Sequence, residues 1–117
     1  MIKLSKMITS EEVKNIVSNE LLESAEINNW HGIDQRNISE YLIQPVKVRL
    51  VNPLTNLLQQ YWLILDEIPE SKDNGYLIVY SEDEKCFGLA TKQNTIFGNI
   101  GTCVSLYDTF IDALNAM

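Results

Sequence analysis

The apolar residues of this chain change their period at Pro45, and this change restricts the folds that the chain can adopt. Residues 46–50 alternate between apolar and basic side chains, as expected of a strand with one buried face. Tyr61–Leu65 and Tyr76–Tyr80 are continuously apolar, which is typical of central strands that are covered on both faces. We therefore expect the chain after Pro45 to form a β-sheet.

Two more strands are predicted beyond these three. One covers Lys85–Lys92, after a short polar turn, and the other covers Ile96–Tyr107, where Gly98 and Gly101 indicate a bulge or a bend. Gly75 ends an Asp-Asn-Gly turn before the third strand and is expected to adopt a positive φ angle. Because the connections between these strands are short, we expect an antiparallel meander with a hairpin between the third and fourth strands.

A helix is predicted at each end of the chain. Thr9 and Glu12 form a capping box at the start of a helix over residues 10–26. The apolar residues of this helix lie on one stripe: Val13, Ile16, Val17, Leu21 and Ala25. Asp108 is the expected N-cap of a terminal helix over Thr109–Ala116. Both helices must bury their apolar stripes on the same face of the sheet.

These elements predict an α+β fold, with an antiparallel meander sheet of about five strands and the N-terminal and C-terminal helices packed on one face. The length of 117 residues and the hydrophobic content of 45% fit a single domain over residues 1–117. The segment Asn28–Gln44 fits either a short helix or a structured loop, and Pro45 is expected to end it.

Acidic residues are concentrated between Asp66 and Glu84. Seven acids and the single base Lys72 give this stretch a net charge of −6, while the whole chain carries −7. If the strands on either side pair in antiparallel fashion, the acids divide between the two ends of one hairpin. The first acidic patch is Asp66, Glu67, Glu70 and Asp73, and the second is Glu82, Asp83 and Glu84. We expect these patches to bind a basic protein partner, and a surface that serves only solubility remains the alternative.

The charge and hydropathy also limit the function classes. A net charge of −7 argues against binding to nucleic acid or to anionic membrane surfaces, since both rely on clustered Lys and Arg. No apolar run approaches the roughly 20 residues that span a bilayer. The first residues lack the apolar core of a signal peptide, so we expect a cytoplasmic protein.

The sequence indicates no catalytic or metal-binding motif. His31 is the only histidine, so a Cys–His pair would have to join it to Cys86 or Cys103. Both cysteines have apolar, strand-like neighbours, and we expect buried, unreactive thiols without a disulfide. One histidine and two separated cysteines do not make a zinc site. We therefore expect a protein without cofactor, metal or enzymatic activity.

The two tryptophans have different sequence contexts. Trp62 lies in a continuously apolar strand and is expected in the core. Trp30 lies in the ambiguous segment, where an exposed tryptophan would indicate a binding anchor. We expect instead that Trp30 fills the gap between the first helix and the sheet.

In size, charge and architecture, the chain is similar to bacterial immunity proteins, which are small acidic cytoplasmic domains that neutralise toxic enzymes, many of them basic nucleases. This resemblance implies a non-enzymatic inhibitor of a toxin. Two alternatives stay open. One is a small-ligand-binding or catalytic α+β domain with a pocket between sheet and helices. The other is a structural homodimer that extends its sheet through an edge strand.

Overall fold

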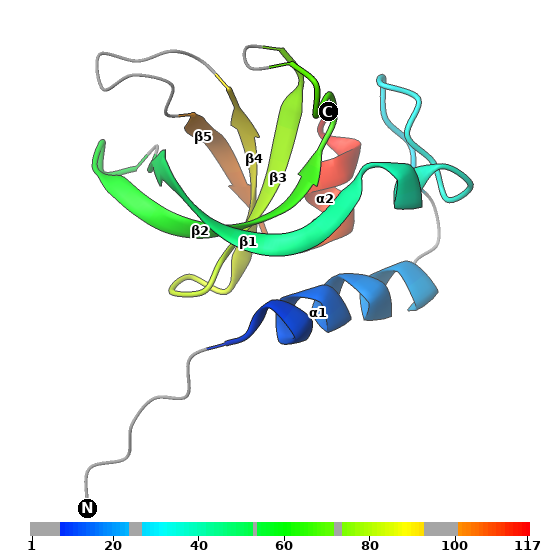
Figure 1. The fold of residues 1–117 in the computed structure, drawn as a ribbon, viewed down its shortest axis with the longest axis horizontal. Coiled ribbons are helices and arrows are strands. Elements are labelled where there is room, and N and C mark those ends of the chain that lie inside the picture. The colour runs from blue at the N-terminus through cyan, green and yellow to red at the C-terminus, as the bar shows by residue number, and fades with distance from the viewer. Residues whose placement is uncertain (1–7, 24–26, 53, 72–73, 93–100) are drawn as a thin grey trace, which may run out of the picture.

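The computed structural model describes residues 8–23, 27–52, 54–71, 74–92 and 101–117 (Figure 1). The predicted α+β class is confirmed, with helices at both ends of the chain and a sheet between them. In chain order the elements are α1 (Ser10–Glu23), the 3-10 helix η1 (Ile38–Glu40), β1 (Leu42–Val51), β2 (Leu58–Asp66), β3 (Tyr76–Ser81), β4 (Cys86–Thr91), β5 (Thr102–Tyr107) and α2 (Phe110–Asn115).

The five strands form the predicted meander, because each consecutive pair of strands is antiparallel. The sheet also closes into a barrel, which the sequence did not predict. Val51 at the end of β1 pairs in parallel with Thr102 at the start of β5. The Val51 amide donates a hydrogen bond of 3.1 Å to the Gly101 carbonyl, next to this pair. In the part of the chain that the structure describes, a single pair of residues therefore joins the first and last strands.

The strand β1 starts at Leu42, so the expectation that Pro45 separates it from the preceding segment is wrong. The register between β1 and β2 shifts between Leu42 and Val46. Pro45 thus lies at an irregular point of the ladder, where a missing backbone N–H is tolerated. The rest of the ambiguous segment consists of turns, η1 and irregular structure over residues 27–41.

The predicted turns around β3 are confirmed. Gly75 has a φ angle of 92°, and Ser81 pairs with Cys86 across the hairpin between β3 and β4. The fifth strand is described from Thr102 onward, with a register shift opposite Leu89 and Ala90 that fits the predicted bulge. Residues 96–100 of the predicted strand lie outside the described residues.

Helix α1 begins with the N-cap bond of the predicted capping box, and the Glu12 side chain reaches the Thr9 hydroxyl. The Glu12 amide donates to Thr9 Oγ1 at 3.2 Å, and the Thr9 hydroxyl donates to the Glu12 carboxylate at the same distance. The N-cap of α2 is Thr109, so the prediction of Asp108 is wrong by one residue. Thr109 has the extended backbone geometry that an N-cap needs, and its side chain accepts from the Asp112 amide.

The sheet has an apolar cluster on each face. The larger one lies between the sheet and both helices, because α1 packs on β1 and β2 while α2 packs on β3, β4 and β5. Both helices therefore cover the same face, as predicted. This cluster includes Val13, Val17, Ile64, Ile78, Phe110 and Leu114. The smaller cluster fills the barrel and consists of Leu50, Tyr61, Leu77, Val79, Ala90 and Cys103.

Candidate interaction surface

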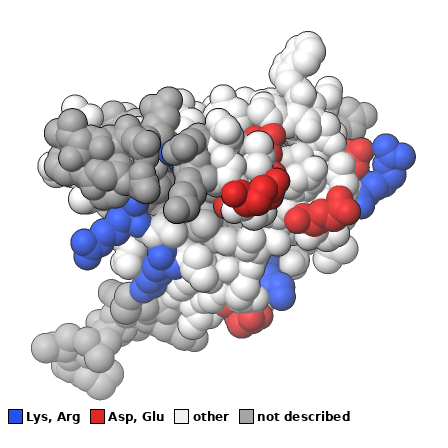
Figure 2. Space-filling model, turned by 45° about the horizontal axis from the view of Figure 1, so that its top comes forward, with Lys and Arg blue, Asp and Glu red and all other residues white. Residues whose placement is uncertain are grey.

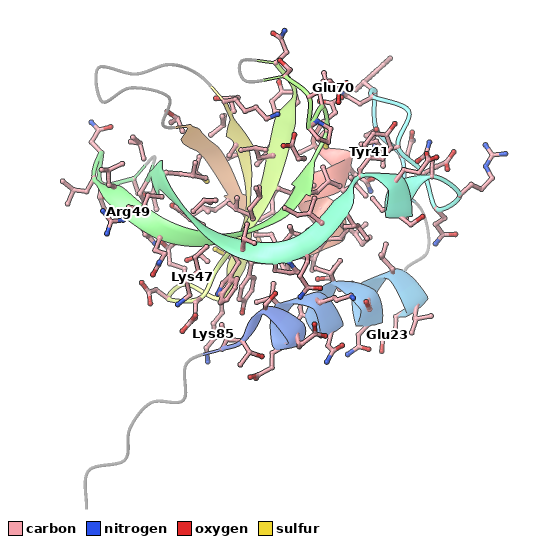
Figure 3. The ribbon with its side chains drawn as sticks, viewed as in Figure 1. Glu23, Tyr41, Lys47, Arg49, Glu70 and Lys85 are labelled. Carbon is pink, nitrogen blue, oxygen red and sulfur yellow. The ribbon has the colours of Figure 1, made fainter. Side chains whose placement is uncertain are left out.

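The two acidic patches lie at opposite ends of the sheet, because β2 and β3 are antiparallel neighbours. Trp62 pairs with Tyr80 at one end of this ladder, and Asp66 pairs with Leu77 at the other. The first patch follows β2 and the second follows β3. In Figure 3, Glu70 of the first patch lies far from Lys85, which ends the turn that holds the second patch.

Asp66 is committed to an internal ion pair. Its Oδ1 lies 2.7 Å from the Lys92 ammonium, and the two side chains are only 18% and 10% exposed. The same ammonium donates to the carbonyls of Ile68 and Ser71 at 2.8 Å each. Lys92 thus ties the loop after β2 to the end of β4, so Asp66 holds the fold together at this point.

Glu67 is also engaged within the chain. Its backbone amide donates to the Tyr76 carbonyl at 3.0 Å, and its Oε1 accepts from the Tyr76 amide at 2.9 Å. Its other carboxylate oxygen contacts Nδ1 of His31, whose ring packs edge-on against Tyr76. Glu67 therefore joins the segment before β1 to the loop between β2 and β3.

The remaining predicted site residues differ in exposure. Glu82 accepts from the Trp62 indole at 3.2 Å, and Glu84 accepts from the Asn52 amide group at 3.2 Å. Glu70, Asp83 and Glu84 are exposed to solvent, while Glu82 is half-buried. Asp73 lies outside the described residues. On the face in Figure 2, several carboxylates group together, while most Lys and Arg lie lower or at the edges.

Trp30 is 96% exposed, so the prediction that it fills a gap in the core is wrong. Its neighbours in sequence are polar, and no helix places it against the sheet. Those polar neighbours are the sequence signal that indicates exposure. Trp62 is buried, as predicted.

The backbone beside Trp30 is firmly held. The Trp30 amide donates to the carbonyl of Met117 at 3.2 Å. The Asn29 side chain accepts from the amides of His31 and Ile33 at 3.0 and 3.2 Å, and it donates to the Ile33 carbonyl at 2.9 Å. Trp30 is therefore presented to solvent on a fixed backbone.

The contact between His31 and Glu67 places Trp30 beside the first acidic patch. We call Trp30, His31, Glu67 and Glu70 the Trp30 surface. It combines the exposed Trp30 ring with the largely buried Glu67 carboxylate, which is 13% exposed, and with exposed Glu70, three residues further along the same loop. This composition is typical of interface anchors, where an aromatic side chain supplies contact area and charges orient the partner.

The two cysteines are free thiols, as predicted. Cys103 is buried, and burial raises the pKa of its thiol to about 11. Cys86 is only half-buried, in contrast to the prediction, although burial still raises its pKa. His31 contacts Glu67 and Tyr76, and no contact between it and a cysteine occurs in the described residues. Among the described residues, neither thiol therefore has a histidine partner that would make it nucleophilic.

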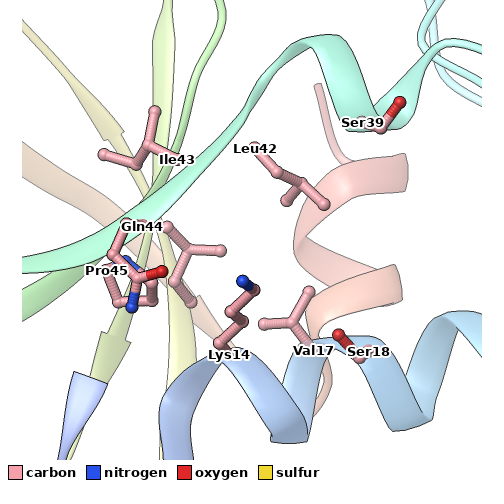
Figure 4. A pocket seen from close by; sticks show the side chains of 9 residues that line it. Lys14, Val17, Ser18, Ser39, Leu42, Ile43, Gln44 and Pro45 are labelled. Atoms are coloured by element: carbon pink, nitrogen blue, oxygen red, sulfur yellow. The ribbon is translucent and has the colours of Figure 1, made fainter. Parts of the chain in front are cut away.

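A pocket of about 280 Å³ lies between α1 and the start of β1 (Figure 4). Its walls are largely apolar and come from Val17, Leu42, Ile43, Pro45 and Ile64. The side chain of Lys14 reaches into it from α1. The amide of Gln44 at its rim already donates to Ser10 Oγ and to Glu11. Such a pocket suits a small apolar molecule with one anionic group.

Within the described residues, His, Cys, Asp and Glu side chains form no group able to hold a metal ion. The helices of the described chain are too short and too polar to cross a membrane. No family model, curated protein or solved structure matches this chain.

Proposed function

We propose that this protein is a non-enzymatic binding module that recognises a basic protein through the Trp30 surface, in the manner of a small acidic inhibitor. The observation that carries the proposal is the exposure of Trp30. Leaving a tryptophan in water forgoes the favourable free energy of its burial, and a bound partner would recover it.

The rigid backbone around Trp30 supports this proposal. The hydrogen bond of the Trp30 amide to the Met117 carbonyl and the bonds between Asn29 and Ile33 fix the chain before binding, so less conformational entropy is lost when a partner docks. The charge also supports the proposal, because the net charge of −7 on the chain attracts a basic partner at long range and raises the association rate. Among the predicted acids, Glu70 is the most suitable contact, since Asp66 and Glu67 serve internal pairs.

The proposal is tested by capturing partners on the immobilised chain and on its Trp30→Ala variant. Loss of a tryptophan anchor costs about 2 kcal/mol or more, so we expect at least a 30-fold weaker Kd for the captured partner. Leu22→Ala is the matched control, since Leu22 is also highly exposed but lies on α1. Equal binding by both variants would refute the role of Trp30.

The contribution of charge is measured separately on the same partner. Glu70→Lys should lower the association rate and reduce its dependence on ionic strength, because a repulsive charge replaces an attractive one. Asp83→Lys makes the same change in the second patch, at the other end of the sheet. If neither substitution alters the association rate, the acidic residues act only as a solubility surface.

The pocket between α1 and β1 favours a second candidate function, the binding of a small apolar anion beside Lys14. Native mass spectrometry of the purified chain tests this directly. An added mass that disappears in a Leu42→Trp variant, where the larger ring fills the pocket, would support it. Observation of the bare chain mass alone would argue against it.

A further inference from the structure

The strand β5 leaves one of its edges largely uncovered. Its other edge pairs with β4 over Phe87–Thr91, but on the side of β1 the described residues pair only at Val51 and Thr102. Beyond that pair, no strand of the described residues pairs with Cys103–Tyr107 on this side. A free edge of this kind is a template for an additional strand.

This edge has a bulge at Val104, but it lacks the charged residues and the proline that also prevent such pairing. Proteins protect free edges with Lys, Pro or other charged residues. The sequence of β5, Thr-Cys-Val-Ser-Leu-Tyr, contains no charged residue and no proline. Val104 is 52% exposed and has no Cα partner on β4, because it lies at the register shift. The edge therefore presents an apolar side chain instead of a protecting charge.

Further apolar side chains lie near the pair of Val51 and Thr102, where the barrel closes. Leu58 pairs with Val51, which in turn pairs with Thr102, so all three lie in one row across the strands. Leu54 and Leu57 are exposed on the loop between β1 and β2. Buried Asn52 holds this loop, since its side chain accepts from the Leu54 amide at 2.7 Å and its carbonyl accepts from Asn56 at 2.9 Å.

The far end of β5 indicates the charge of the occupant. Leu106 and Tyr107 line an open hollow of about 510 Å³ together with Cys86 and three acids, which are Glu84, Asp108 and Asp112. No Lys or Arg of the described part of the chain lines this hollow. Among the described residues, neither Asp108 nor Asp112 has an ion pair with a cation. A Lys or Arg side chain in this hollow would be electrostatically complementary.

We propose that the free edge of β5 binds an extended, basic segment of another protein as an additional strand, with apolar side chains against Val104 and a Lys or Arg in the acidic hollow. A second copy of this chain fits less well, because β5 itself carries no cation and each copy adds a net charge of −7. The proposal concerns a different surface from Trp30 and does not depend on it.

The test uses a capped hexapeptide of alternating valine and lysine as the probe, with the full-length chain. Titration should shift the backbone amide signals of β5, and the β5 amides should exchange with solvent more slowly in the complex. The same peptide N-methylated at every residue keeps its charge but cannot donate backbone hydrogen bonds. We expect at least tenfold weaker binding for this methylated peptide.

The acidic hollow is tested with the double variant Asp108→Asn and Asp112→Asn, after its unfolding midpoint has been compared with that of the native chain. We expect severalfold weaker peptide binding. A control variant, Glu23→Gln with Glu40→Gln, removes two exposed carboxylates elsewhere and should bind normally. Equal binding of the methylated peptide, or signal shifts away from β5, would overturn strand addition. Self-association that shifts the same β5 amide signals without the peptide would show that a second copy is the occupant and would overturn the proposal.

Discussion

Cys103 lies in the interior of the barrel, where its thiol is held in the neutral form. Its side chain packs with Tyr61, Val79 and Ala90, away from water. Gly88 on β4 makes room for it, because a Cβ atom at that position would lie 2.7 Å from the sulfur. Ionisation here would place a charge in apolar surroundings without a cation, which explains the raised pKa of the thiol.

The raised pKa of Cys103 predicts a loss of stability in alkali. The thiol of the unfolded chain ionises near its usual pKa of about 9, while the folded thiol stays neutral up to about 11. Stability is therefore intact below pH 9 and falls as the pH rises toward 11, by at most about 1.4 kcal/mol per pH unit for this one proton. Urea unfolding between pH 7 and 11 measures the slope.

Buried Tyr61 also has a raised pKa and therefore also lowers stability in alkali. Comparison with Cys103→Ala separates the contribution of the Cys103 thiol from that of Tyr61. The variant should lose stability less steeply between pH 9 and 11. Native Cys103 should also react with iodoacetamide more slowly than half-buried Cys86 at neutral pH. Equal slopes for the native chain and the variant, or rapid labelling of Cys103, would contradict its neutral, buried state.

The exposure of single residues was predicted with uneven success. Trp62 and Cys103 lie in apolar strands, so their burial follows from local pattern. The environment of Trp30 depends on contacts from distant parts of the chain, including the carbonyl of Met117, and no local pattern encodes them. The ion pair of Asp66 with Lys92 likewise joins residues 26 positions apart, so the sequence could place Asp66 in a patch but not in a pair.

At the scale of elements, α2 is short and depends on the core for its stability. A helix of six residues is not stable alone in water. Its apolar side chains Phe110, Ala113 and Leu114 are fully buried against the sheet. The side chain of Glu20 on α1 also accepts the amides of Phe110 and Ile111 at 3.0 and 3.3 Å, so the two helices support each other.

Leu114→Ala should therefore destabilise the protein by about 2–5 kcal/mol, as usual for truncation of a buried leucine. Leu22→Ala is the control, because Leu22 also lies in a helix but is 85% exposed. Leucine and alanine have similar helix propensities, so the control should change stability by less than about 0.5 kcal/mol. The free energy of unfolding is measured with urea. A cost below 1 kcal/mol for Leu114→Ala would mean that α2 does not belong to the core.

Element types were predictable, while some of their ends were not. The capping box at Thr9 and the period of two after Pro45 are local signals, and both correspond to observed elements. No local signal predicts the early start of β1, because Leu42 belongs to the strand through its pairing with Leu65 of β2. A proline within the strand concealed this extension, since it normally marks an end.

At the scale of the whole molecule, closure of the barrel depends on a very small contact. Only Val51 and Thr102 pair between the first and last strands, within the described residues. The meander was predictable from the short connections between strands. Its closure depends on the accumulated twist and curvature of five strands, which no sequence pattern specifies. The same limited contact leaves the rest of the β5 edge available for an added strand.

Gly101 occupies the point where the barrel closes. Its carbonyl accepts from Val51, and a Cβ atom at this position would lie 2.4 Å from the Thr91 carbonyl oxygen and 3.0 Å from Leu50. Gly101→Ala would therefore force the start of β5 away from β4 or from β1. We expect a loss of about 1–3 kcal/mol in the free energy of unfolding, as is usual for overpacking.

Hydrogen exchange measures whether this loss is local to the closure. In Gly101→Ala, the Val51 amide should lose far more protection than the amides between β3 and β4, because its acceptor moves first. Gly88→Ala is the matched control, since its added Cβ meets Cys103 inside the barrel and not at the closure. It should destabilise the chain without selective exposure of Val51. If both variants expose Val51 equally, the parallel pair is not a separate closing contact and the barrel opens only by global unfolding.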